Sequence, residues 1–376
     1  MNIKMNRRQL FKNTAAVVTV STLGSTSLKA ICANTNKAKN VIFFYVPLGA
    51  PHGKWVPSMS NGEVELNECT QPYESVKQRC VFFDNMKTRG GQWRDLDGVR
   101  VGRRTRKSLI EIFAEKNTGH YPMNFLPITS GSGISYQVNR VSFHSNPWST
   151  YDHLKEITAA PYIELLEKNM QHSLALIEQT TGLDKDEITR YQDKLKQKVS
   201  ELNTKDGEML AIPQRRGIET YAQRTDYQII NAVSAIKSNK TSVVHFVTGE
   251  TNNQPLIDGL GDYHTIIHSG GREYILQRAA FDQKVADLIK LLEDTNDDSG
   301  EPLIDSTLVV LYSNEGDAEP HDNRESPYML AGGSFLNGGQ INSSDNQDEF
   351  LDTIIALMDS SYPYSSDNGP LLDIIA

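Results

Sequence analysis

Uninterrupted apolar runs recur along the chain and predict buried strands. The first, "NVIFFYVP" at Asn40–Pro47, is rich in aromatic and β-branched residues and is followed by a Gly-containing turn. Similar runs occur at Arg79–Met86, Thr241–Gly249 and Ser306–Gly316, and a shorter one in "SPYMLAGG". Strands of this kind, apolar at successive positions, are typical of a mostly parallel sheet that is covered on both faces.

Amphipathic stretches between these runs predict helices. Ser108 and Glu111 form a capping box at the start of "SLIEIFAEK". Further helices are predicted at Tyr274–Thr295 and in "DEFLDTIIALM". Strands and helices that alternate in this way imply right-handed crossovers. We therefore expect a single α/β domain over residues 34–376, with a mostly parallel sheet and helices on both faces.

The middle of the chain predicts a long amphipathic helical insertion. In "LDKDEITRYQDKLKQKVSELNTK" the apolar positions are three or four residues apart, at Ile188, Tyr191, Leu195, Val199 and Leu202. Charged residues occupy the other faces, and Asp184 suits the N-cap. We expect a partly exposed helical arm at about residues 151–236 that serves packing rather than catalysis.

The first 33 residues have the pattern of a twin-arginine signal peptide. Arg7 and Arg8 open "NRRQLFK", a weakly apolar segment follows, and Lys29 precedes small residues. Cleavage after Ala33 would release a periplasmic or secreted protein, with the twin-arginine translocation machinery as its export partner. The alternative interpretation of this segment is a basic amphipathic helix.

Composition excludes several classes of function. The chain has 38 Lys and Arg against 47 Asp and Glu, and the leader holds five of the basic residues, which leaves 33. A chain this acidic is not expected to bind nucleic acid. No apolar run in the mature chain reaches the roughly 18 residues of a transmembrane helix. We also find no motif for a nucleotide or haem cofactor.

Two cysteines remain once the leader, with Cys32, is removed. Cys69 and Cys80 lie close together in the sequence of a protein that we expect in an oxidising compartment. Such a pair predicts a disulfide that closes a short loop. Two buried free thiols are the alternative.

The candidate chemistry lies after two of the predicted strands. His264 and His268, four residues apart in "GDYHTIIHSGG", would share one helix face next to Asp262. A second group, Asn314, Glu315 and Asp317, lies at the end of the run at 306–316, and His321 follows shortly after. Ligands of parallel sheets bind at the carboxyl ends of strands. We expect a mixed nitrogen and oxygen site for zinc, manganese or iron, with calcium not excluded. The alternative is an acidic surface loop beside two histidines that merely share a helix face.

From Asn40 to Met358 the chain resembles the HXXSHH family, also called domain of unknown function 1552. The resemblance rests on the twin-arginine leader, "NVIFFYVPLGAPHGKWVP", "DKDEITRYQDKLKQKVSELN", "VVHFVTGETNNQ" before "GDYHTIIHS", and "PLIDSTLVVLYSNEGDAEPHDNRESPYMLAGGSFLNGG". This family of exported bacterial proteins is placed in the alkaline phosphatase-like superfamily with the sulfatases. The resemblance implies that fold and the activity of a metal-dependent hydrolase of anionic esters. The metal ligands that we expect are His264, His268 and His321, with Asp262, Glu315 and Asp317 as further candidates.

The chain departs from the superfamily pattern at several positions. His52 stands after the first strand where the hydrolases have Asp, and Asn314 with Glu315 replaces an Asp-His pair. Ser108 stands at a helix start behind a basic run, as the nucleophile would, but its capping box explains it without chemistry. These departures leave a second function open, a non-catalytic binding or assembly factor with envelope protein partners.

Overall fold

The computed structural model of the chain describes residues 37–87, 99–101, 105–118, 120–131, 142–157, 208–215, 219–248, 257, 259–358 and 368–376. The predicted signal peptide and the amphipathic helix at 183–205 lie outside the described residues.

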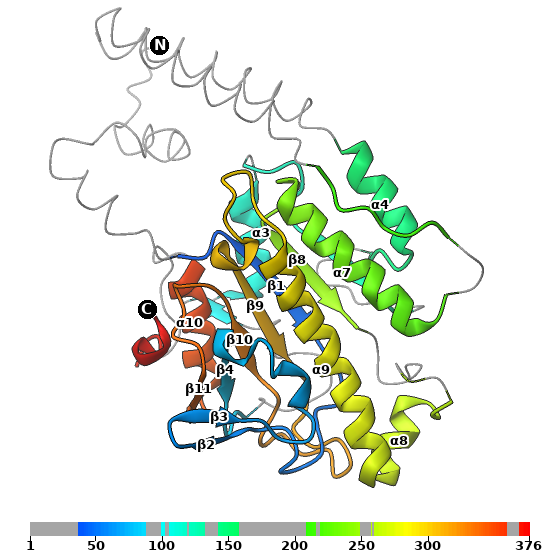
Figure 1. The fold of residues 1–376 in the computed structure, drawn as a ribbon. Coiled ribbons are helices and arrows are strands. Elements are labelled where there is room, and N and C mark those ends of the chain that lie inside the picture. The colour runs from blue at the N-terminus through cyan, green and yellow to red at the C-terminus, as the bar shows by residue number, and fades with distance from the viewer. Residues whose placement is uncertain are drawn as a thin grey trace, which may run out of the picture.

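A seven-stranded sheet forms the centre of the protein (Figure 1). Its strands are β1 (Asn40–Tyr45), β4 (Cys80–Phe83), β7 (Leu126–Thr129), β8 (Val243–Val247), β9 (Thr307–Tyr312), β10 (Met329–Ala331) and β11 (Gln340–Asn342). They lie in the order β11-β4-β10-β9-β1-β8-β7. Every neighbouring pair is parallel except the two that involve β10, which is antiparallel to β4 and β9. The predicted mostly parallel sheet is confirmed.

Helices cover both faces of the sheet (Figure 1). On one face lie α7 (Tyr221–Lys237) and α9 (Gly271–Asp294), and on the other lie α3 (Leu109–Asn117) and α10 (Gln347–Met358). The short helix α8 (Tyr263–Ser269) directly precedes α9, and α4 (Pro147–Glu156) packs on α7. The α/β class with helices on both faces is therefore confirmed.

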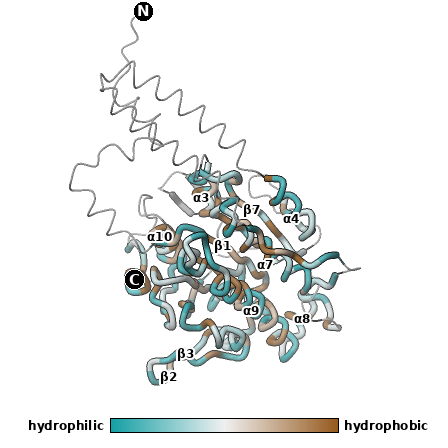
Figure 2. Tube along the Cα trace, turned by 45° about the horizontal axis from the view of Figure 1, so that its top comes forward, coloured by the Kyte–Doolittle hydropathy of each residue, from teal (hydrophilic) through white to brown (hydrophobic). Residues whose placement is uncertain are grey.

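Alternation along β1 explains the two layers. Ile42 and Phe44 belong to the core beneath α7 and α9, whereas Phe43 and Tyr45 belong to the core beneath α3 and α10. Successive side chains of a strand point to opposite faces, so a strand that is apolar throughout must be buried on both. Figure 2 shows hydrophobic stretches running through the interior.

Short elements complete the described residues. Strands β2 (Ser58–Ser60) and β3 (Glu63–Glu65) form one antiparallel pair, and β5 (Val99–Val101) and β6 (Thr105–Lys107) form another. The 3-10 turns are η2 (Gln71–Tyr73), η3 (Lys77–Arg79), η4 (Leu303–Ser306) and η5 (Leu372–Ile374). Within the described ranges, each helix is too short or too polar to span a bilayer.

The residues predicted as a helical arm, about 151–236, include most of α7. Its apolar face, with Ile229, Val233 and Ile236, is buried in the core against the sheet. Thr220 begins this helix, because its side chain accepts a hydrogen bond from Gln223 N and the Gln223 side chain accepts one from Thr220 N. This part of the predicted arm is thus one of the covering helices of the domain.

The predicted disulfide between Cys69 and Cys80 is wrong. Both residues are free thiols buried in the core beneath α9. The Cys80 sulfur lies 3.4 Å from the carbonyl oxygen of Val76, and the Cys69 sulfur lies 3.9 Å from that of Ile275. Each sulfur therefore has its own carbonyl partner in the core, where a free thiol packs as a small hydrophobe.

Candidate functional site

The loops that leave β1 and β9 lie side by side at the carboxyl end of the sheet. Leu48 N donates to Asn314 Oδ1 over 2.9 Å, and Ala50 N donates to Gly316 O over 2.7 Å. Gly49 lies between them at φ 55°, and a Cβ there would fall 1.9 Å from Gly316 O. Only glycine permits this approach, so the contact between the two exit loops depends on Gly49.

Helix α8 presents the first two histidines. Asp262 caps it: one carboxylate oxygen accepts from Thr265 N over 2.9 Å, the other from Thr265 Oγ1, and these bonds lower the pKa of Asp262. His264 and His268 then lie one turn apart on the same face. Their Nε2 atoms are 3.1 Å apart, so one ring donates a hydrogen bond to the other.

His321, from the β9 exit loop, joins this pair. Its ring centroid lies 5.2 Å from that of His268, and the His264 and His268 centroids are 4.7 Å apart. His321 has φ 53°, a left-handed conformation that residues other than glycine seldom adopt. Such strain often occurs where a side chain is held for function. His264, His268 and His321 are called the histidine cluster below.

Glu315 adds a carboxylate to the histidine cluster. Its Oε2 lies 3.6 Å from His321 Nδ1, which is too long for a hydrogen bond. This oxygen is buried and has no hydrogen-bond partner among the described residues. Burial raises the pKa of Glu315, and the three nearby histidines act in the opposite direction. A buried carboxylate oxygen without a partner calls for a cation or an ordered water.

The residue types at this site are those that bind divalent metals. Three imidazoles and one carboxylate match the ligands of zinc and related ions. Two nitrogens bound at 2.0–2.1 Å to one tetrahedral ion lie about 3.3 Å apart, close to the 3.1 Å between His264 and His268. As arranged, no set of three or more His, Cys, Asp or Glu side chains in the described ranges is placed so that it could hold a metal ion. The side chains would have to move for a metal to bind.

Two predicted ligands have other hydrogen-bond partners in the structure. Asp262 uses both oxygens to cap α8, as described above. Asp317 accepts from Glu319 N with one oxygen and from His52 N with the other, each over 2.9 Å. Both carboxylates order the backbone that carries the histidine cluster.

Ser108 has the predicted capping box. Its Oγ accepts from Glu111 N over 3.1 Å, and Ser108 N donates to Glu111 Oε2 over 2.7 Å. The side chain is buried, and α3 covers the opposite face of the sheet from α9. The structure thus confirms the cap, and a nucleophilic role for Ser108 stays a prediction.

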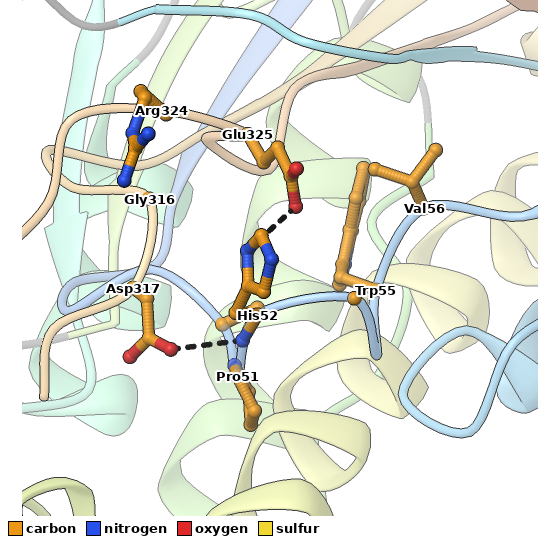
Figure 3. Close-up of a pocket in the computed structure, with 10 residues that line it drawn as sticks. Pro51, His52, Trp55, Val56, Gly316, Asp317, Arg324 and Glu325 are labelled. Atoms are coloured by element: carbon orange, nitrogen blue, oxygen red, sulfur yellow. Dashed lines mark hydrogen bonds and ion pairs between the residues drawn. The ribbon is translucent and has the colours of Figure 1, made fainter.

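A small pocket lies between the β1 and β9 exit loops (Figure 3). The space within it, including open solvent at its mouth, is about 210 Å³, and its lining includes His52, Asp317, Arg324 and Glu325. His52 Nδ1 lies 3.0 Å from Glu325 Oε2 (Figure 3). Arg324 pairs instead with Asp322. The pocket is thus lined by groups that are already paired.

Sequence reasoning missed Glu319, which the structure places near the site, whereas Asn314 belonged to the predicted group. Glu319 approaches the end of α8, since a Cβ on Gly270 would lie 3.3 Å from its Oε2. Asn314 is buried, and its Nδ2 has no partner within the described part of the chain although its Oδ1 is fixed by Leu48 N. Glu319 stands between Asp317 and His321, so its position in that acidic loop was the available signal.

Comparison with known proteins gives distant structural likenesses. No family model and no curated protein sequence matches the chain. The C-terminal periplasmic domain of EcEptC from Escherichia coli is 11% identical with a TM-score of 0.42, covering 90% of this chain and 87% of that one. The phosphonate monoester hydrolase SpPMH from Silicibacter pomeroyi is 11% identical with a TM-score of 0.40, covering 89% and 76%. The lipoteichoic acid synthase LtaP from Listeria monocytogenes is 13% identical with a TM-score of 0.37, covering 88% and 74%.

These likenesses are too distant to indicate a function, which must be argued from the geometry of the chain's own residues. The resemblance to the HXXSHH family stays a prediction. What the fold and the site define is an α/β protein with three imidazoles and a buried carboxylate gathered at the carboxyl edge of a mostly parallel sheet.

Proposed function

We propose that the protein binds a divalent metal ion at the histidine cluster and Glu315 and hydrolyses anionic esters of the phosphate or sulfate type. The observation that carries the proposal is the convergence of His264, His268 and His321 from two distant segments onto a buried carboxylate. One oxygen of that carboxylate has no hydrogen-bond partner in the part of the chain that the structure describes. Burying such a group without a partner costs about 1–3 kcal/mol, which a bound cation would offset.

The residues divide the work of binding. Helix α8 holds His264 and His268 one turn apart, so these two would contribute adjacent nitrogen ligands. The β9 exit loop contributes His321 and the negative charge of Glu315. When bound, the metal would polarise the ester oxygen and lower the pKa of a bound water. The Nδ2 of Asn314, which has no partner among the residues that the structure describes, is a donor available to an oxygen of the anionic group.

Export forms part of the proposal. Arg7 and Arg8 support delivery by the twin-arginine route to the periplasm or beyond. An acidic chain of this kind would act on small anionic esters only with a local positive charge, because its overall field repels them. A metal held by neutral imidazoles supplies that charge.

Metal binding is tested first, on the purified mature protein. Zinc or manganese at about 100 times its dissociation constant should add roughly 2.7 kcal/mol to the free energy of unfolding. His264→Ala and His268→Ala should abolish this gain. His153→Ala is the matched control, because His153 also stacks on a second histidine, His144, but in a pair from a different region. Wild-type protein that gains no stability from any divalent ion would refute the proposal.

Ester hydrolysis is tested next. Aryl phosphates and aryl sulfates should be turned over by the metal-loaded wild type and not by His264→Ala. Ser108→Ala decides the role of Ser108: a nucleophile is required for turnover, whereas a cap costs about 1 kcal/mol of stability and spares activity. Metal binding without turnover of either ester class would favour the non-catalytic binding protein.

A further inference from the structure

A fully buried polar network lies beneath the site and is centred on helix α9. Arg278 and Asp282, one turn apart, form an ion pair with no exposed surface. Asp282 also accepts from Trp55 Nε1 over 3.1 Å and from Tyr73 OH over 2.9 Å. The network joins α9 to the segment between β1 and β4 and is closed to solvent.

Two side chains of α9 extend from this network to the loops that carry the site. Arg278 Nη1 donates to Gly49 O over 2.8 Å. Tyr274 OH donates to Leu48 O over 2.7 Å, and it accepts from Ala318 N over 3.4 Å. Burial raises the pKa of Tyr274, which keeps the hydroxyl protonated and able to donate. A single hydroxyl therefore bridges the β1 and β9 exit loops.

The backbone at this bridge is strained. Leu48 has φ 66°, an outlying conformation for a bulky side chain. Its carbonyl is held by Tyr274 and its amide by Asn314 Oδ1. Strained conformations persist where the surroundings fix them from several sides, and here the fixing groups come from α9 and the β9 exit.

Tyr274 also contacts α8, the helix that carries His264 and His268. Its ring centroid lies 6.3 Å from that of Tyr263, the residue before His264. Tyr263 packs against Phe281 as well, with centroids 5.2 Å apart, so α8 rests on α9 through this residue. Tyr274 thus touches all three segments that form the site: α8, the β1 exit loop and the β9 exit loop.

We propose that Tyr274 is a positioning residue, which sets the distance between the His264 and His268 pair on α8 and the His321 and Glu315 pair in the β9 exit loop. It contacts no ligand itself and acts through the backbone of Leu48 and Ala318. Of the two measurements that test this role, zinc affinity rests on the proposed metal site, whereas hydrogen exchange in the loops does not.

The first readout needs no metal. Tyr274→Phe keeps the ring and removes the hydroxyl, so amide hydrogen exchange at residues 46–50 and 316–321 should accelerate about tenfold, as expected for the loss of one buried hydrogen bond. Tyr73→Phe is the matched control, because it removes an equally buried hydroxyl that contacts Asp282 and neither site loop. It should leave exchange in both loops unchanged.

The second readout is zinc affinity, measured by competition with a chelating dye. Loss of a residue that orients ligands weakens metal binding about 10- to 100-fold. We expect this loss in Tyr274→Phe and an unchanged affinity in Tyr73→Phe.

The outcomes separate the two proposals. The positioning role is overturned if exchange accelerates in only one loop or in neither, if Tyr73→Phe has the same effects, or if Tyr274→Phe fails to fold and so shows a general structural role. If the wild type binds no zinc, the proposed function falls, and the exchange measurement on metal-free protein still decides the role of Tyr274.

Discussion

The histidine cluster with Glu315 and the Arg278–Asp282 network differ in how fully their buried carboxylates are hydrogen-bonded. Asp282 accepts four hydrogen bonds, from Trp55, Tyr73 and two nitrogens of Arg278. One buried oxygen of Glu315 accepts no hydrogen bond from the described residues. Both carboxylates are buried, yet only one has its bonding capacity filled by the protein.

This difference is consistent with a structural role for Asp282 and a ligand-binding role for Glu315. Burying an ion pair is costly, and the pair persists only where further hydrogen bonds satisfy both partners, as they do around Asp282. An incompletely satisfied cluster destabilises the fold and is retained where a ligand completes it. These observations support the two proposals, positioning by the network and binding by the cluster.

The largest expected effect on stability comes from breaking the Arg278–Asp282 ion pair. Asp282→Ala would leave the Arg278 guanidinium buried without its counter-charge, which costs about 3–5 kcal/mol of the free energy of unfolding. Urea unfolding of the metal-free protein measures this loss. The control is Asp294→Ala, which breaks an exposed pair with Lys290 on the same helix and should change stability by less than about 0.5 kcal/mol. Equal effects of the two substitutions would remove the distinction between the clusters.

Glu315→Gln should have a smaller effect of the opposite sign. Because burial raises the pKa of Glu315 in the folded state, its charged form opposes folding above that pKa. A neutral amide of the same shape should stabilise the metal-free protein by about 1 kcal/mol at neutral pH and abolish metal binding.

The pH dependence gives this prediction a second check. A folded-state pKa above the unfolded value means that the penalty is complete above the folded pKa and vanishes below the unfolded one. The stability difference between Glu315→Gln and wild type should therefore shrink as the pH is lowered through the pKa of Glu315. A variant less stable than wild type at neutral pH would show that the carboxylate is satisfied in the fold.

Local patterns explain what could be predicted from the sequence. The apolar runs predict β1, β8 and β9, since strands buried on both faces need no alternation. The capping box predicts the start of α3, and the spacing of four residues places His264 and His268 on one face. Each of these signals lies within about ten residues of chain, the range over which periodicity is informative.

Local patterns of this kind could not predict contacts between residues far apart in the sequence. Tyr274 and Arg278 read as ordinary positions of an amphipathic helix, and their bonds to Leu48 and Gly49 cross more than half of the chain. The short strand β10 has too few residues to show that it runs antiparallel to its neighbours. The pairing of Cys69 and Cys80 was inferred from compartment and count, neither of which contains the geometry of the sulfurs.

The smallest expected effect concerns the two thiols, Cys69 and Cys80, near the Arg278–Asp282 network. Cys69 lies near Asp282 and Arg278, and burial raises its pKa to about 12. Both thiols should therefore resist alkylation at pH 8 in the folded protein and react once it is unfolded, because the thiolate is the reactive form. A reducing agent should change the free energy of unfolding by less than about 0.5 kcal/mol, whereas the loss of a native disulfide costs about 2–5 kcal/mol. A loss of that size would mean that a covalent bond, and not the hydrogen bonds of Asp282, fixes the segment between β1 and β4 against α9.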